Sequence, residues 1–81
     1  MALIQEFFER QSDVQRVHAP VTCGYRSFTV QGKRYLQLDT YGTEDRVKKG
    51  AISQSIQLDE EAAEKLMRLL LETFPSLRGK V

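Results

Sequence analysis

The chain is poor in the residues that most often carry chemistry. It has one cysteine, one histidine and no tryptophan among 81 residues. The single cysteine, Cys23, excludes a disulfide within the chain, and one cysteine with one histidine cannot supply the ligands of a zinc site. No glycine-rich phosphate motif follows a predicted strand. These absences leave little for a catalytic centre, and we expect no enzyme activity, no cofactor and no bound metal.

The net charge is also small, and the chain has no long apolar run. The net charge is +1, so electrostatic binding must come from a local cluster rather than from the field of the whole protein. No apolar run approaches the roughly 18 residues that span a bilayer, and the N-terminus carries acidic groups where a signal peptide is basic. With 41% hydrophobic and 28% charged residues, we expect one soluble domain over residues 1–81, cytoplasmic and without a membrane partner.

The periodicity of apolar residues predicts the order α-β-β-β-α. A short N-terminal helix is expected over about 2–11, where apolar residues recur at helical spacing, namely Leu3, Ile4, Phe7 and Phe8. A hairpin over about 21–41 and a third strand over about 51–58 follow. The last helix spans about 60–74, because Asp59 can cap its first turn and Pro75 ends it. The predicted fold class is α+β, an antiparallel three-stranded sheet backed by the C-terminal helix.

The hairpin turns at Gln31-Gly32, where glycine accepts a positive φ without strain. The register is open between two loops. A three-residue loop pairs Phe28 with Leu36, whereas a two-residue loop pairs Phe28 with Tyr35 and mixes apolar and polar residues on both faces. We favour the three-residue loop, because it gathers Phe28, Leu36 and Leu38 on one face. The other face then holds Tyr25, Ser27, Thr29, Tyr35, Gln37 and Asp39.

The C-terminal helix is apolar over more than one stripe. Its expected core stripe consists of Ala63, Leu66, Met67, Leu70 and Phe74. Leu69 and Leu71 widen the apolar surface beyond what a three-stranded sheet can cover. A helix that is apolar over so wide an arc is usually covered on two sides. We therefore predict a homodimer that packs through Leu69 and Leu71.

The polar side of the strands indicates a binding surface, because it is rich in tyrosine and in neutral hydrogen-bonding groups. Cations flank it, on the hairpin tip and in the loop 42–50. Proteins that bind single strands combine cations along phosphates with rings on which bases stack. We predict a non-catalytic domain that binds nucleic acid, with single-stranded DNA or RNA favoured. The expected contact residues are Arg46, Lys48, Lys49, Tyr35, Tyr41, Gln37, Ser53, Ser55, Lys33 and Arg34.

Two other functions remain open from the sequence. A protein-interaction module would use the same face, with Tyr25, Tyr35 and Tyr41 as anchors for a protein partner. Steep weakening by salt would favour nucleic acid over this alternative. A small metal-dependent nuclease would need carboxylates from a strand end, a loop and the helix cap, for which Asp39, Glu44, Asp45 and Asp59 are available.

Two resemblances add to this interpretation. The segment Gln37-Leu38-Asp39-Thr40-Tyr41-Gly42, then Arg46, then Ser53 to Asp59, resembles small uncharacterised bacterial proteins with a QLDTYG…R…SQSIQLD signature. Such proteins are often labelled methionyl-tRNA formyltransferase, but that enzyme needs a folate-binding domain far larger than 81 residues. The order of elements is similar to that of the positive-cofactor-four family of single-strand DNA-binding coactivators. It consists of a strand, a basic loop that ends in Lys49-Gly50, a second strand, and a helix whose first turn is acidic. That likeness implies a dimer made by paired helices, with sheets and loops that grip single strands.

Overall fold

A computed structural model describes residues 1–42 and 51–81 of the chain. The fold is α+β, with a four-stranded mixed sheet and one long helix at the C-terminal end. The strands are β1 (Ala2–Ile4), β2 (Thr22–Val30), β3 (Lys33–Tyr41) and β4 (Gln54–Leu58), and they lie in the order β1-β4-β3-β2. The helix α1 (Glu60–Thr73) and a short 3-10 helix, η2 (Pro75–Gly79), follow. No helix in these described ranges has the length and apolarity to cross a membrane.

The N-terminal residues form a strand, so the predicted helix over about 2–11 is wrong. Ala2, Leu3 and Ile4 pair in parallel with Ile56, Gln57 and Leu58 of β4. The helical spacing of the apolar residues is present in the sequence, but three turns of isolated helix are marginal, and pairing with the free edge of β4 prevails. The predicted antiparallel three-stranded sheet therefore gains a fourth strand, which is parallel to its neighbour.

The hairpin has a two-residue turn, which corrects the predicted register. Val30 pairs with Lys33, and Phe28 pairs with Tyr35. Both turn residues have positive φ, 49° at Gln31 and 79° at Gly32. Two successive positive φ values are typical of a type I′ turn, whose twist matches that of the flanking strands. The strands are thus aligned one residue away from the favoured register, and every cross-strand neighbour differs from the prediction.

The actual register places different residues on the two faces of the sheet. Residues directly opposite each other share a face, and the faces alternate along each strand. We call one side the polar face; it includes Arg26, Phe28, Lys33, Tyr35, Gln37, Asp39, Tyr41, Ser55 and Gln57, with the apolar Leu3 and Val30 at its margins. We call the other side the apolar face; it holds Tyr25, Ser27, Thr29, Arg34, Leu36, Leu38, Ile56 and Leu58. Phe28 and Tyr25 have therefore exchanged the faces on which the sequence predicted them.

The helix α1 begins after an N-cap, as the sequence predicts. The backbone N–H of Ala62 donates to Oδ1 of Asp59 at 2.9 Å, and Asp59 has extended φ and ψ of −87° and −178°. Glu60 and Glu61 in the first turn favour the positive end of the helix dipole. Pro75 follows the C-cap residue Phe74. Asp59 and Pro75 thus fix both ends of the helix.

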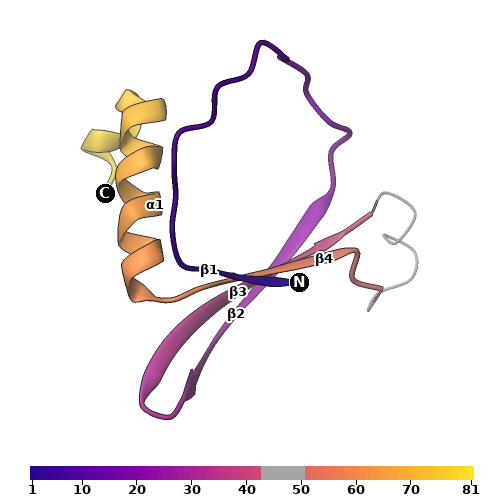
Figure 1. Cartoon of the computed structure of the whole chain (residues 1–81), viewed down its shortest axis with the longest axis vertical. Helices are drawn as coiled ribbons and strands as arrows, with labels where there is room; N and C mark the ends of the chain where they lie inside the picture. Colours follow the sequence, from indigo (N-terminus) through magenta and orange to yellow (C-terminus); the bar gives the residue numbers. More distant parts are fainter. Residues whose placement is uncertain (43–50) are drawn as a thin grey trace.

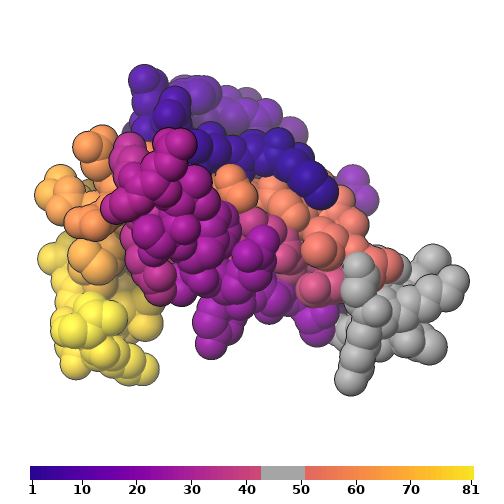
Figure 2. Space-filling view, turned by 90° about the horizontal axis from the view of Figure 1, so that it is seen from below, coloured from indigo at the N-terminus to yellow at the C-terminus, as the bar shows by residue number. Residues whose placement is uncertain are grey.

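The helix stands at one end of the sheet, where it leaves β4, and residues 5–21 form a wide arch between β1 and β2 (Figure 1). Seen from below, the end of α1 and the C-terminal turn project at one side of the molecule, with the hairpin in the middle (Figure 2). Leu58 and Ala62 are the apolar residues that are buried, at 2% and 3% exposure, among those that the structure describes. The core of the single chain therefore lies at the junction of β4 and α1.

Candidate functional site

An aromatic and cationic stack lies on the polar face, near the middle of the hairpin. Phe28 and Tyr35 face each other across β2 and β3, with ring centroids 5.7 Å apart and ring planes inclined by 27°. Cζ of Arg26 lies 4.9 Å from the centroid of the Phe28 ring. Arg26 is exposed, whereas both rings are half-buried. The three side chains form a partly accessible platform of two stacked rings and one guanidinium group.

A network of neutral amides joins this platform to the centre of the sheet. Oε1 of Gln37 accepts from Nη2 of Arg26 at 3.4 Å and from Nε2 of Gln57 at 2.9 Å. Nε2 of Gln37 in turn donates to Oδ1 of Asp39 at 2.9 Å. Gln37 therefore has one amide orientation that satisfies all three partners, and β2, β3 and β4 are linked through its side chain.

Asp39 is the charged centre of the network and is 7% exposed. Oγ of Ser55, also 7% exposed, donates to Oδ1 of Asp39 at 2.5 Å. The pKa of Asp39 is lowered from its ordinary value, chiefly by this hydrogen bond from Ser55. The hydrogen bond from Gln37 and the nearby charge of Arg26 lower it further, although burial acts in the opposite direction. Asp39 is thus an ionised acceptor whose bonds orient its neighbours.

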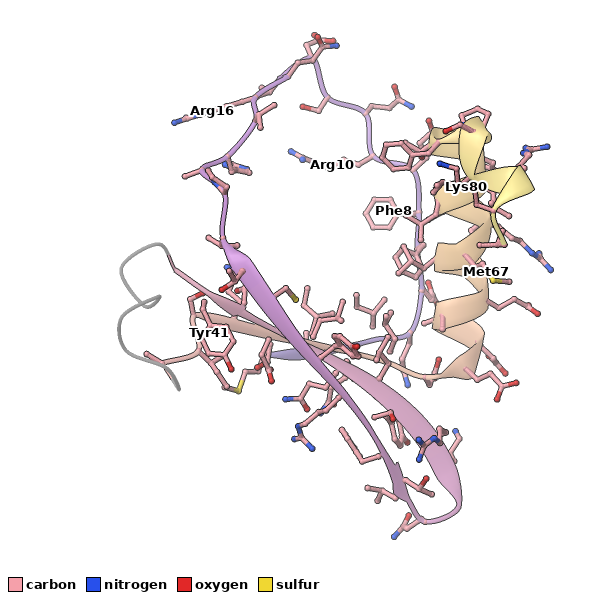
Figure 3. The ribbon with its side chains drawn as sticks, turned by 180° about the vertical axis from the view of Figure 1, so that it is seen from behind. Phe8, Arg10, Arg16, Tyr41, Met67 and Lys80 are labelled. Atoms are coloured by element: carbon pink, nitrogen blue, oxygen red, sulfur yellow. The ribbon has the colours of Figure 1, made fainter. Side chains whose placement is uncertain are left out.

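Tyr41 continues the polar face toward the far end of β3. A Cβ placed on Gly24 would lie 3.4 Å from Cε2 of Tyr41, so the ring lies over this glycine, which is its diagonal neighbour on β2 and pairs with Asp39. Tyr41 is half-buried, and its side chain lies at the end of the sheet opposite to the hairpin tip (Figure 3). Tyr35 and Tyr41 therefore share a face, as the sequence predicts, with Gln37 and Asp39 between them.

Several predicted contact residues lie elsewhere. Arg34 is on the apolar face, where its guanidinium donates to Oγ of Ser27 at 2.8 Å and to Oγ1 of Thr29 at 3.1 Å. Ser53 precedes β4 and bonds Thr40, through its backbone N–H and through its hydroxyl. Lys33 lies on the polar face at the hairpin tip. Arg46, Lys48 and Lys49 lie outside the described residues.

Sequence reasoning missed Arg26 and Phe28, because both depend on the register. In the favoured register Phe28 belonged to the apolar core and Arg26 had no role. The signal that would have found them is the glycine at the second turn position, since a two-residue turn places the alternating Gly24, Arg26 and Phe28 on the face of Tyr35.

The carboxylates do not gather into a metal site within residues 1–42 and 51–81, where no group of three or more potential ligands is found. Asp59 is engaged as a helix cap, and Asp39 is engaged with Ser55 and Gln37. Glu44 and Asp45 lie outside the described residues. The described geometry thus offers ring stacking, one guanidinium group and fixed amides as its means of recognition.

Comparison with known proteins identifies no relative. No family model, no curated protein and no solved structure matches this chain. Both resemblances noted in the sequence therefore stay predictions, and any function must be argued from the side chains of the polar face.

Proposed function

We propose that the chain binds single-stranded nucleic acid through the polar face. The observation that supports this most is the platform of Arg26, Phe28 and Tyr35 on the hairpin. Flat rings and a guanidinium group provide surfaces on which unpaired bases stack, at about 1 to 3 kcal/mol per base. A base in a duplex is already stacked on its neighbours, so such a platform favours single strands over duplexes.

The amide network supports the platform by holding its components in place. Gln37 accepts from Arg26 while it donates to Asp39, so the guanidinium group has a partner that favours its position over the Phe28 ring. A side chain that is already oriented loses less entropy when a ligand binds. Asp39 keeps its negative charge on this face, and the nearby positive charge of Arg26 offsets part of its repulsion of a phosphate backbone.

Phosphate contacts on the described part of the polar face can come from Arg26 and Lys33. Two such contacts imply a salt dependence of about −1.4 in the slope of log affinity against log salt on single strands. We therefore expect the affinity to depend only weakly on salt and to fall clearly when a ring of the platform is removed. The cations Arg46, Lys48 and Lys49 belong to the proposal on the sequence alone and would make the slope steeper.

A fluorescence anisotropy titration with a single-stranded oligonucleotide, at low and at raised salt, tests the proposal. Tyr35→Leu keeps apolar bulk but removes the ring, and we expect it to weaken binding by about 5- to 150-fold, the equivalent of one lost stacked base, without changing the salt slope. Arg26→Ala should weaken binding and flatten the slope by about 0.7.

Arg68→Ala is the matched control, because it removes one exposed arginine from α1, where its Nη2 lies 3.6 Å from Oε1 of Glu64. This variant should bind as the parent does. An equal loss in Arg68→Ala and Arg26→Ala would mean that the total charge, and not the polar face, attracts the strand. The absence of binding to DNA and RNA at low salt would overturn the proposal, and would leave the same rings as anchors for a protein partner.

A further inference from the structure

A small hollow lies on the polar face beside the platform, on the side of the sheet where β1 runs along β4 (Figure 1). Its volume is about 310 Å³, at the lower end of the range in which proteins hold small ligands. The residues that line it include Met1, Leu3, Gln37, Ser55 and Gln57. Leu3 is 41% exposed, so the hollow combines an apolar wall with amide and hydroxyl groups.

The amide of Gln37 has one orientation, which its two charged neighbours determine. Asp39 is ionised, because its pKa is lowered chiefly by the hydrogen bond from Ser55, and an ionised carboxylate only accepts. The guanidinium group of Arg26 only donates. Nε2 of Gln37 must therefore face Asp39, at 2.9 Å, and Oε1 must face Arg26, at 3.4 Å.

This orientation determines that of Gln57 as well. Oε1 of Gln37 accepts from Nε2 of Gln57 at 2.9 Å, so Oε1 of Gln57 lies on the other side of its amide. Within residues 1–42 and 51–81, Oε1 of Gln57 has no hydrogen-bond partner, and one N–H of its Nε2 is also free. Ser55 gives its hydroxyl proton to Asp39, so its Oγ can only accept from a ligand. The hollow thus presents an amide edge, with an acceptor beside a donor, in surroundings rich in acceptors.

Such an edge matches a base that carries an amino group beside a ring nitrogen. Cytosine and adenine both have this edge, and it is accessible in a single strand. The amino group donates to Oε1 of Gln57 and the ring nitrogen accepts from Nε2, a bidentate pairing of the kind that glutamine makes with adenine. Uracil and thymine pair with the same amide only through their ring N–H. That pairing leaves a carbonyl oxygen next to Oε1 of Gln57, where two acceptors repel each other.

We infer that this hollow holds one base of a bound single strand and that Gln57 selects cytosine or adenine over uracil or thymine. The inference rests on the proposed function, because it needs a strand on the polar face. Gln37 lines the hollow and also accepts from Arg26 of the platform, so a strand on the platform lies within reach of the hollow. The platform supplies affinity for any base, since every base has a face that stacks, and the amide edge of Gln57 adds the preference.

An oligodeoxycytidine and an oligodeoxyuridine of equal length give the sharpest comparison, because the two bases have nearly the same shape and differ at this edge. In anisotropy titrations, the parent protein should bind the cytidine strand more tightly by about 5-fold or more, the lower limit for one bidentate pair. Equal affinities, or a preference for the uridine strand, would overturn the inference and leave the proposed function intact. Failure of both strands to bind would overturn the proposed function, and the inference with it.

Gln57→Met tests whether this side chain is the source of the preference. Methionine keeps the length of glutamine and removes the amide, so the ratio of the two affinities should fall to about one through weaker binding of the cytidine strand. An unchanged affinity for the uridine strand would show that the variant is folded.

Gln54→Met is the matched control, because Gln54 lies on the same strand but pairs with Thr40 on the opposite face. This variant should keep the ratio of the parent protein. A folded Gln57→Met protein that keeps the preference for cytidine would overturn the assignment to Gln57. Loss of the preference in Gln54→Met would do the same, because it would show that any such change in β4 abolishes selection.

Discussion

Removal of the helix cap gives a quantitative test of how α1 is anchored. Asp59→Ala removes the acceptor that the backbone N–H of Ala62 uses at 2.9 Å. An N-cap substitution of this kind costs about 1 kcal/mol, within a range of about 0.5 to 2 kcal/mol. The first turn lies against the buried junction with β4, where Ala62 is 3% exposed, so this N–H has little water to replace its partner. We therefore expect a loss in the upper half of that range.

Thermal unfolding followed by circular dichroism measures the effect. For a domain of this size, a loss of 1 kcal/mol lowers the melting temperature by about 4 to 8 °C. Parent and variants are compared at one protein concentration, so that any self-association contributes equally to their stability by mass action. Asp59→Asn is the matched control, since asparagine is an equally good cap without the charge. It should melt within a degree or two of the parent, on the same scaling.

Two results would refute this reasoning. An Asp59→Ala variant that melts with the parent would mean that the cap contributes nothing to stability. An Asp59→Asn variant as unstable as Asp59→Ala would mean that the negative charge, and not the hydrogen bond to Ala62, matters at the start of the helix.

Three further perturbations test other parts of the structure. Leu58→Ala should destabilise the fold by about 2 to 5 kcal/mol in urea unfolding, because Leu58 is 2% exposed at the junction of β4 and α1; a loss below about 1 kcal/mol would contradict its place in the core. Gln31→Asn should stabilise the hairpin by a few tenths of a kcal/mol to about 1 kcal/mol, because asparagine tolerates the positive φ of 49° better than glutamine does; a less stable variant would argue against the type I′ turn. The lowered pKa of Asp39 means that its stabilising contribution is present above its ordinary pKa of 3.8 and is lost as the pH falls through the lower folded value. Asp39→Asn should therefore make stability less dependent on pH in acid, and an unchanged pH profile would contradict that assignment.

Local signals in the sequence were enough to predict most of the elements. The helix is defined by Asp59 at its start and Pro75 beyond its end, and the structure has α1 over Glu60–Thr73. The hairpin and the third strand are present at Thr22–Val30, Lys33–Tyr41 and Gln54–Leu58. These signals act through neighbouring residues, through capping bonds or through backbone restriction, so they can be read without knowledge of the tertiary structure.

Non-local pairing decides what the sequence did not predict. Leu3 and Ile4 have helical spacing, but pairing with β4 turns them into a strand, and nothing near them in the sequence signals that partner. The register depends on Gln31, which adopts a positive φ that is uncommon for its residue type. The candidate site inherits that error. Tyr35, Gln37 and Tyr41 share a face in either register, but Arg26 and Phe28 lie on that face only in the actual register.

Amide chemical-shift mapping by NMR, with a single-stranded oligonucleotide added at low salt, tests whether the polar face binds the strand. It reports where a ligand binds as well as whether it binds. We predict the largest shifts at Arg26, Phe28, Tyr35 and Gln37, with little change along α1. Shifts confined to Met67, Leu70 and Phe74, or a spectrum that the oligonucleotide leaves unchanged, would contradict the assignment of the polar face as the nucleic-acid-binding surface.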